Sequence, residues 1–338
     1  MLKKLSKNVF WVYNLYMITI YRNEGTNLLY ESIEDVDFEN VAKNTWIHIQ
    51  NPTQENLEKI SKATKLSIDY LSSALDEEET AHIEADEDDD ITYVVLDTPY
   101  IKDLETGVYA TAPFIIVFNE NYFVTIANHE FELIPEVLKK VKKIETKKHV
   151  RLSTHFIFRL MTLYISYLKK IDNHFKEIEE KMSKSTKNKE LYEMMDINKT
   201  LVLFSTALNS NRAVILKLFR LEYYKKFEED YDLMDDARIE CNQAIEMVST
   251  YRDILKGSMD AYANIISNNL NTVMKTLAVV TIVISIPTLI ASLFGMNFEE
   301  IPMDVHPYGF WITIGISAVL SVIGAIFLII FTKNKRRD

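Results

Sequence analysis

Apolar residues in the first 150 positions form short runs rich in β-branched and aromatic side chains, separated by amphipathic stretches. Such runs predict strands, and the amphipathic stretches predict helices. The predicted strands are 46–49, 91–97, 113–118 and 122–127, and the predicted helices include 53–75 and 130–145. This alternation indicates a layered α/β/α domain within an α+β protein. With a helical hairpin that follows, the domain is predicted to span residues 1–222.

The pattern becomes purely helical after about residue 152. Apolar residues then recur at alternating steps of three and four, which predicts two long helices joined by a polar turn near 183–190. A third helix is predicted from about Asp235 to residue 293, because no proline occurs between Asp235 and Pro287. It would be roughly 90 Å long at 1.5 Å per residue. No compact domain needs such a helix, so we predict a stalk over 223–276 that continues into a membrane.

Two long segments near the C-terminal end carry no charge. Residues 277–294 and 311–331 contain no Asp, Glu, Lys or Arg, and each is about long enough to cross ~30 Å of hydrocarbon. A buried core helix is the alternative for the first of them. Lys275 and the basic tail 332–338 flank the two segments, whereas the connecting loop 295–310 has no Lys or Arg. The positive-inside rule therefore predicts a multi-pass membrane protein with both termini cytosolic.

Hydroxyl residues follow one stripe of the first apolar segment at helical spacing. They are Thr281, Ser285, Thr288 and Ser292. The same stripe continues through Ala278, Met274 and Asn271 on one side and Gly295 on the other. Two interpretations stay open: the stripe packs against a neighbouring helix, or it lines a water-filled lumen. A lumen requires a ring of subunits, because one copy cannot enclose a pore.

Composition narrows the class of function. The net charge of −11 argues against nucleic acid as a partner, since phosphate binding needs a basic face. It is compatible with cation binding, although charge alone favours an ordinary acidic surface. The single cysteine, Cys241, and seven histidines without HxxxH or HExxH spacing offer no transition-metal cage. Because there is also no phosphate-binding glycine loop or nucleophile–base signature, we expect no enzyme.

The first apolar segment ends in Gly295-Met296-Asn297. This tripeptide between the two segments, the acidic short loop and the basic tail resemble the CorA family of magnesium channels. Residues 251–257 and 271–275 look like the family's stalk and pore entrance, and 46–49 looks like an early strand of its cytosolic domain. The resemblance implies a funnel-shaped homopentamer in the cell membrane, with the first segment lining the pore and the second surrounding it.

The resemblance also implies roles for individual residues. Gly295, Met296 and Asn297 would form the selectivity filter, and the stripe from Asn271 to Ser292 would face the pore. Loop acids would raise the local cation concentration; they are Glu299, Glu300 and Asp304. Asp236 matches an aspartate of the cytosolic Mg²⁺ sensor, but Ser72-Ser73 stand where its acidic partner is expected. The other candidates for a regulatory metal are Asp69, Asp76, Asp253 and Asp260.

From these observations we predict a channel for passive, potential-driven influx of hydrated Mg²⁺, also admitting Co²⁺ or Ni²⁺, and gated by cytosolic Mg²⁺. Amide and hydroxyl groups can hydrogen-bond the water shell of an ion that releases water reluctantly. Two alternatives stay open. One is a Zn²⁺ or Co²⁺ transporter of the same family, and the other is a membrane-anchored sensor or scaffold that conducts nothing.

Overall fold

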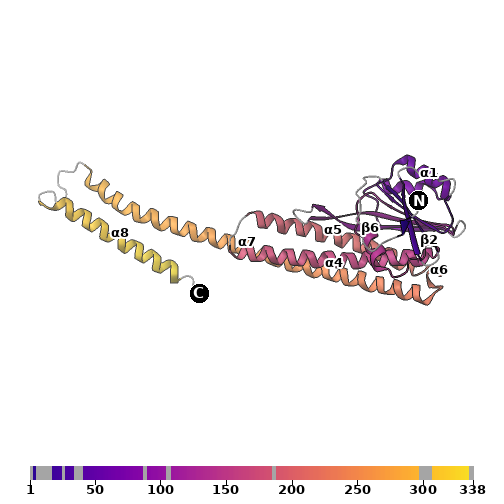
Figure 1. Cartoon of the computed structure of the whole chain (residues 1–338). Coiled ribbons are helices and arrows are strands. Elements are labelled where there is room, and N and C mark those ends of the chain that lie inside the picture. The colour runs from indigo at the N-terminus through magenta and orange to yellow at the C-terminus, as the bar shows by residue number, and fades with distance from the viewer. Residues whose placement is uncertain are drawn as a thin grey trace. The chain divides into compact units, whose positions relative to one another are not determined.

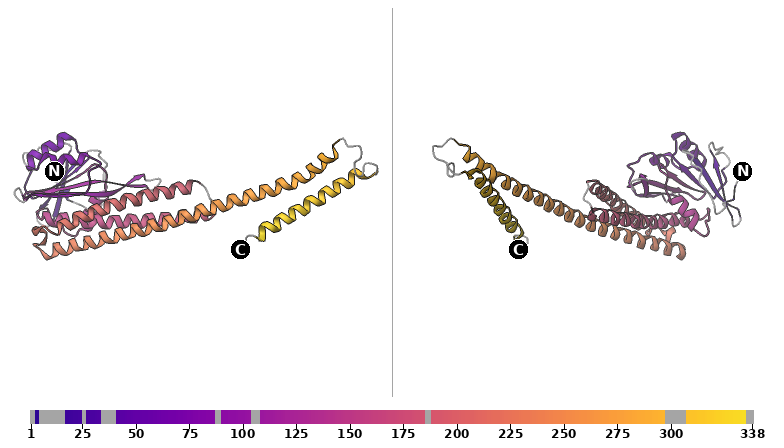
Figure 2. Two further views of the ribbon diagram at one scale, coloured as in Figure 1. Left: turned by 180° about the vertical axis from the view of Figure 1, so that it is seen from behind. Right: turned by 60° about the vertical axis from the view of Figure 1, so that its left-hand side comes forward.

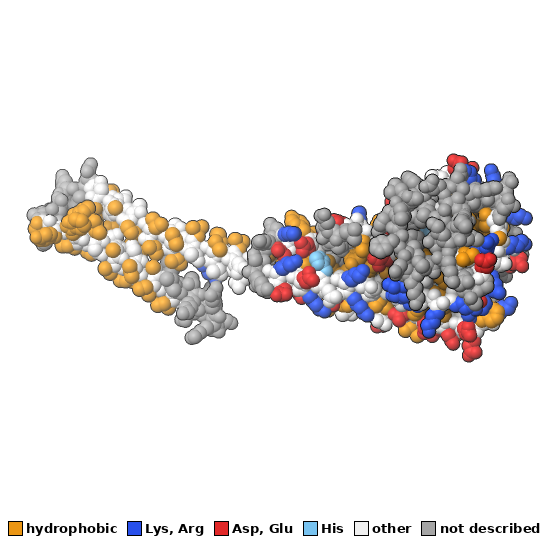
Figure 3. Space-filling model, in the orientation of Figure 1, with side chains coloured by type: hydrophobic (Ala, Val, Ile, Leu, Met, Phe, Trp, Pro, Cys, Tyr) orange, Lys and Arg blue, Asp and Glu red, His pale blue; other side chains and the backbone are white. Residues whose placement is uncertain are grey.

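The structure is a computed structural model of the 338-residue chain. It describes residues 3–4, 17–24, 27–33, 41–86, 90–103, 108–184, 188–296 and 307–334. The chain forms two compact units, Met1–Gly257 and Ser258–Asp338. Charged side chains cover the first unit, whereas the described surface of the second is largely apolar (Figure 3). This difference already separates a water-exposed part from a part suited to lipid.

An eight-stranded sheet forms the core of the first unit, in the order β1-β3-β2-β4-β8-β7-β6-β5. The strands are β1 (Lys3–Lys4), β2 (Met17–Glu24), β3 (Asn27–Ile33), β4 (Thr45–Gln50), β5 (Ile83–Asp86), β6 (Ile91–Asp103), β7 (Val108–Phe118) and β8 (Tyr122–Ala127). The central pair β4 and β8 is parallel, and the other neighbours are antiparallel. All four predicted strands are therefore confirmed as β4, β6, β7 and β8.

Strand β6 is longer than predicted because it continues through Pro99 to Asp103. Strand β5 pairs with β6 only as far as Val94. Beyond that residue one side of β6 has no strand partner among the described residues. A proline is tolerated at such an edge, since its missing N–H interrupts no ladder there.

Alternating side chains of the sheet bury two opposite faces. In β4, Ile47 and Ile49 join the apolar cluster beneath α1, whereas Trp46 packs against Phe156 of α4 with ring centroids 5.4 Å apart. Figures 1 and 2 show α1 on one face of the sheet and α4 and α5 on the other. The predicted α/β/α layering is thus present in the first unit.

The predicted helix 53–75 is wrong as one element. The chain forms α1 (Gln54–Thr64), α2 (Ile68–Ser72) and a 3-10 turn, Ser73–Leu75. Lys65 ends α1 in a left-handed conformation with φ 58°, and Ser67 caps the start of α2 by accepting a hydrogen bond from the Asp69 N–H. Hydrogen bonds of this kind satisfy backbone groups that have no intrahelical partner where the helix breaks.

Among the described residues, the next five helices after β8 include α4 and α5, which contact the second face of the sheet. The five helices are α3 (Leu133–Lys140), α4 (His149–Lys184), α5 (Asn188–Leu218), α6 (Glu222–Lys225) and α7 (Glu228–Phe294). The predicted helix 130–145 is shorter, and the third long helix begins at Glu228 rather than near Asp235. Its first turn carries acidic residues, which favour a helix N-terminus electrostatically. Arg151 of α4 bonds Asp230 there at 2.5 Å.

The second unit contains the C-terminal part of α7 and helix α8 (Gly309–Asn334). By length and composition, both helices can cross a membrane. Helix α7 continues through Pro287 to Phe294, so the predicted long helix leading into the first apolar segment is confirmed.

Candidate functional site

Three of the four hydroxyl groups of the α7 stripe use their hydrogen in the same way. Thr281 donates to the Leu277 carbonyl at 2.8 Å, Ser285 to the Thr281 carbonyl at 2.7 Å, and Thr288 to the Ile284 carbonyl at 2.9 Å. A hydroxyl has one donor and two acceptor lone pairs. Once the donor is engaged four residues back, the oxygen presents only acceptor capacity to its surroundings. The stripe is therefore a line of hydrogen-bond acceptors.

Helix α7 is partly buried on the side opposite the hydroxyl stripe. Half-buried residues there are Val279, Val283, Ile286 and Ile290, whereas the hydroxyl residues Thr281, Ser285, Thr288 and Ser292 are all exposed. At about 100° per residue, the centres of these two sets lie roughly 160° apart around the helix. The hydroxyl stripe thus faces away from the packed side of α7.

Helix α8 covers that packed side with small residues. Ser317 and Ser321 are buried, and a Cβ built on Gly324 would lie 3.1 Å from the Cδ1 of Ile286. The Ser321 hydroxyl donates to the Ser317 carbonyl at 2.9 Å, so its donor is satisfied within α8. Small residues allow close helix approach in membranes. The sequence analysis did not single out this α8 face, although the four-residue spacing of Thr313, Ser317 and Ser321 was the signal for it.

Three further positions of the predicted stripe precede the hydroxyl residues. They are Asn271, Met274 and Ala278, and all three side chains are exposed within the chain. Exposed apolar residues flank the stripe on both sides, among them Leu277, Ile284 and Leu289. In a single chain, the polar stripe and the apolar residues that flank it are therefore exposed. They lie in a segment that is apolar enough to cross a membrane.

The end of α7 brings Gly295 against backbone. Its N–H donates to the Ala291 carbonyl at 3.0 Å, and an added Cβ would lie 3.2 Å from that oxygen and 3.4 Å from the Ser292 carbonyl oxygen. Met296 follows with an exposed side chain. The remaining residues predicted for the filter and the connecting loop lie outside the described residues; they are Asn297, Glu299, Glu300 and Asp304.

The aspartates proposed for regulation are dispersed. Asp236 and Asp253 are exposed on α7, and their separation of seventeen residues corresponds to about 26 Å along the axis. Asp260 is exposed in the second unit, and Asp76 accepts a hydrogen bond from the Glu78 N–H at 2.9 Å. Within the ranges that the structure describes, no group of three or more His, Cys, Asp or Glu side chains could hold a metal ion.

Comparisons with known proteins give one consistent picture. A family model described as "CorA-like Mg2+ transporter protein" matches residues 41–336. The cobalt/magnesium transport protein CorA of Methanocaldococcus jannaschii is 28% identical over 307 residues, which cover 89% of this chain and 94% of that protein. The family match alone covers most of the chain.

Solved structures show the same likeness. The complete structure of the CorA magnesium transporter from Methanocaldococcus jannaschii has a TM-score of 0.75 at 24% identity, covering 94% of this chain and 98% of that one. The cytoplasmic domain of ZntB from Vibrio parahaemolyticus has a TM-score of 0.57 at 14% identity, covering 76% of this chain and 99% of that domain. At these identities the structures show a shared fold.

Proposed function

The chain belongs to the CorA-like Mg²⁺ transporter family, and on this premise we propose that it conducts hydrated Mg²⁺ through a pore lined by α7. Divalent cations are the transported substrate in this family, whose members are transporters and not enzymes. Beyond family membership, we propose the identity of the ion, a passive mechanism and the residues that line the pore. One observation carries it: the acceptor stripe of α7 faces away from α8.

A line of acceptors suits a hydrated cation. Water molecules around Mg²⁺ direct their oxygens at the ion and their hydrogens outward, and the ion releases these waters reluctantly. Oxygens of Thr281, Ser285 and Thr288 can accept those outward hydrogens without replacing the waters. Conduction needs contacts this weak, because an ion that is held tightly does not leave.

The stripe also argues for several copies of the chain. Exposed hydroxyl groups bordered by exposed apolar residues fit a ring in which neighbouring α7 helices contact each other and the hydroxyl groups meet water at the axis. We therefore propose a homo-oligomer, with five subunits as the resemblance implies. Helix α8 would occupy the outer layer between α7 and lipid.

The mouth and the driving force complete the proposal. We propose that Gly295, Met296 and Asn297 form the filter at the extracytoplasmic end, and that the loop acids concentrate cations before it. With the first unit in the cytosol, a membrane potential of 100 mV favours entry of two charges by about 4.6 kcal/mol. Such a gradient drives Mg²⁺ inward without a coupled ion.

Regulation by cytosolic Mg²⁺ is proposed through the exposed aspartates. Within one chain these carboxylates are too far apart to share an ion, as the exposed residues Asp236 and Asp253 illustrate. An ion would bind where carboxylates of adjacent subunits approach one another and would hold them together, and its loss would free the subunits to move. Binding to one arrangement alone shifts the population toward that arrangement.

The test is flux of Mg²⁺ into liposomes that contain the purified chain. The double variant Thr281→Val and Thr288→Val keeps side-chain shape and removes two acceptors per chain, and we expect flux to fall at least about tenfold as the lumen becomes apolar. The matched control is Thr276→Val, because Thr276 makes the same bond four residues back at 2.9 Å and lies off the stripe. Unchanged flux in the double variant would refute the lining.

The same liposomes separate the two alternatives. A Zn²⁺ or Co²⁺ transporter would carry those ions in preference to Mg²⁺ when each is supplied alone, with and without a proton gradient. A non-conducting sensor would carry none of them, and its Asn297→Ala variant would behave as the unaltered protein does.

A further inference from the structure

A cavity of about 830 Å³ opens in the first unit where α4 begins. This volume falls within the roughly 300–1,000 Å³ of small-molecule sites. Lysine, arginine and aromatic side chains contribute to its wall, including Lys147, Arg151, Tyr223, Lys226 and Phe227. None of the residues proposed for conduction or for Mg²⁺ sensing lines it, so it requires a separate explanation.

The start of α4 departs from the usual charge preference of a helix. The Lys148 carbonyl accepts the Leu152 N–H at 2.9 Å, which makes Lys148 the N-cap, and a lysine side chain has no acceptor with which to cap. The first turn of this 36-residue helix contains no acidic residue. Cations at the positive end of a helix dipole are unfavourable, and such departures concentrate at functional sites.

Only some of these cations have an anionic partner in the described part of the chain. Arg151 bonds Asp230 and Glu229, and the Lys148 ammonium lies 2.9 Å from a Glu145 carboxylate oxygen. No ion pair is found there for Lys147 or Lys226. Backbone N–H groups of the first helical turn and two exposed ammonium groups therefore remain available to an anion.

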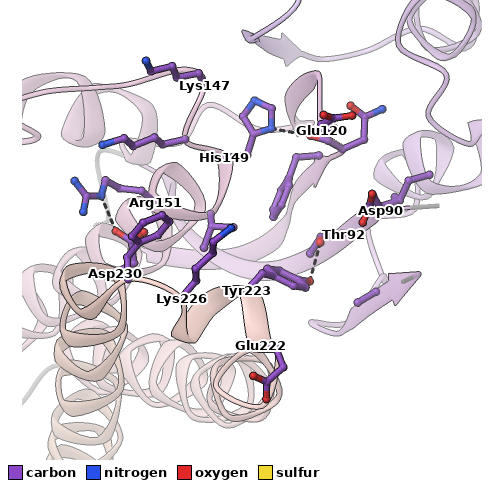
Figure 4. A pocket seen from close by; sticks show the side chains of 17 residues that line it. Asp90, Thr92, Glu120, Lys147, His149, Arg151, Glu222, Tyr223, Lys226 and Asp230 are labelled. Carbon is purple, nitrogen blue, oxygen red and sulfur yellow. Dashed lines mark hydrogen bonds and ion pairs between the residues drawn. The ribbon is translucent and has the colours of Figure 1, made fainter. Parts of the chain in front are cut away.

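Aromatic residues form one part of the wall, and charged residues of opposite sign form others. The Tyr223 hydroxyl is fixed by a 2.8 Å hydrogen bond with Thr92, and the neighbouring Phe227 ring is 57% exposed. An exposed aromatic ring beside a cationic group can stack a planar heterocycle. Figure 4 shows Lys147, Arg151 and Lys226 on one side of the cavity, and Asp90 and Glu120 on the other.

His149 adds an unsatisfied polar atom to this wall. The residue is buried and lines the cavity, and its Nδ1 lies 2.7 Å from the Asn119 carbonyl oxygen. Its Nε2 makes no hydrogen bond within the described residues. Buried polar atoms without a partner are uncommon in native proteins, and because this nitrogen has almost no accessible surface, a ligand could contact it only after the imidazole turns toward the cavity.

We propose that this cavity binds a nucleoside polyphosphate in its Mg²⁺-complexed form. The phosphates lie against Lys147, Lys226 and the first turn of α4, and the base stacks on Phe227. Asp90 and Glu120 on the far side, and Glu222 on another part of the wall, repel a bare polyanion, whereas the bound Mg²⁺ offsets part of that repulsion. The site is independent of the pore, so its existence does not depend on conduction.

Isothermal titration of the full chain in detergent tests the proposal, with ATP added to protein already saturated with Mg²⁺. We expect one ATP per chain. The double variant Lys147→Gln and Lys226→Gln should weaken binding about tenfold or more, since each charge-assisted contact is strong. The matched control is Lys189→Gln with Lys199→Gln on α5, which removes the same charge away from the cavity and should leave the affinity unchanged.

Phe227→Leu separates a nucleotide site from a plain phosphate site. This exposed side chain can be replaced without disturbing the core, and we expect the variant to weaken ATP binding several-fold and to leave pyrophosphate binding unchanged. The proposal is overturned if ATP gives no binding heat, or if the control pair weakens binding as much as the cavity pair. It is also overturned if inorganic phosphate or pyrophosphate binds as tightly as ATP and Phe227→Leu has no effect.

Discussion

Gly324 of α8 lies directly against Ile286 of α7, so closely that a Cβ on the glycine would be 3.1 Å from the isoleucine Cδ1. This contact assigns one side of α7 to α8 and leaves the hydroxyl side uncovered. The hydroxyl side is therefore the side of α7 that this contact leaves free for the proposed lumen.

Gly324→Leu should force α7 and α8 apart. The added carbons meet Ile286, and overpacking of this kind costs about 1–3 kcal/mol. We expect a lower thermal unfolding temperature in detergent and a smaller fraction of oligomer in size-exclusion chromatography. Gly315→Leu is the control on the same helix, because nothing lies within 4 Å of its Cβ position.

A second substitution identifies the contact responsible. Adding Ile286→Ala to Gly324→Leu vacates the space that the leucine needs, so the double variant should recover much of the lost stability. If the double variant lost as much stability as the two single variants together, the two residues would not interact.

Cysteine accessibility should follow the two sides of α7. In liposomes, a charged thiol reagent should modify Thr281→Cys and Ser285→Cys and block Mg²⁺ flux, whereas Ile286→Cys and Ile290→Cys should stay unmodified. The native Cys241 gives no background, because it is buried and burial raises the pKa of its thiol to about 12. Equal modification of both sides would contradict a lumen on the hydroxyl side.

Asn211 should be essential for packing α5 on the sheet. Its Oδ1 accepts the Asp97 N–H at 2.9 Å, and its Nδ2 donates to the Asp97 carbonyl at 2.8 Å. Asn211→Leu leaves those strand groups without this partner, which we expect to cost about 2 kcal/mol or more. Asn209→Leu, at an exposed position two residues earlier, should change the free energy of unfolding by less than about 0.5 kcal/mol. Denaturant unfolding measures both.

Acid should destabilise the first unit partly through His48. Burial lowers the pKa of this imidazole from 6.5 to about 4, so between these values the unfolded chain binds the proton and the folded chain does not. The free energy of unfolding therefore falls as pH drops through this range, by about 3 kcal/mol for one such group. His48→Gln should reduce the slope of stability against pH.

Some pH dependence should remain in that variant. Burial, aided by Arg151 and Arg159, also lowers the pKa of His155 to about 4. Unfolding of both proteins at several pH values between 4 and 8 measures the difference. Identical slopes would mean that His48 does not titrate on unfolding.

Local patterns in the sequence were enough to predict the elements whose environment is uniform. The strands 122–127 and 46–49 are buried on both faces, and their sequences are apolar except for Thr125 and His48. The long helix from about Asp235 was predicted from an apolar period that runs without proline as far as Pro287. The broken helix after Thr53 could not be predicted in the same way, because its break depends on one left-handed residue, Lys65, and on a serine cap.

The candidate site also has features that the sequence predicts and features that it does not. Spacing alone placed Thr281, Ser285 and Thr288 on one side of a helix, because the α-helical period is a property of the backbone. It could not say whether that side packs or faces water, since either use favours small hydroxyl residues. The cavity at the start of α4 was not predicted either, because its lysines and aromatic residues come from segments far apart in the chain.

The two apolar helices, the hydroxyl stripe and the family likeness can all be recognised in the sequence, because each depends on residues close together along the chain. Two relationships became visible in the fold alone: α8 covers the side opposite the stripe, and Lys147 and Lys226 line one cavity. Those relationships depend on which surfaces meet when distant segments pack, and side-chain volume and hydrogen bonding select among arrangements that the local pattern permits equally.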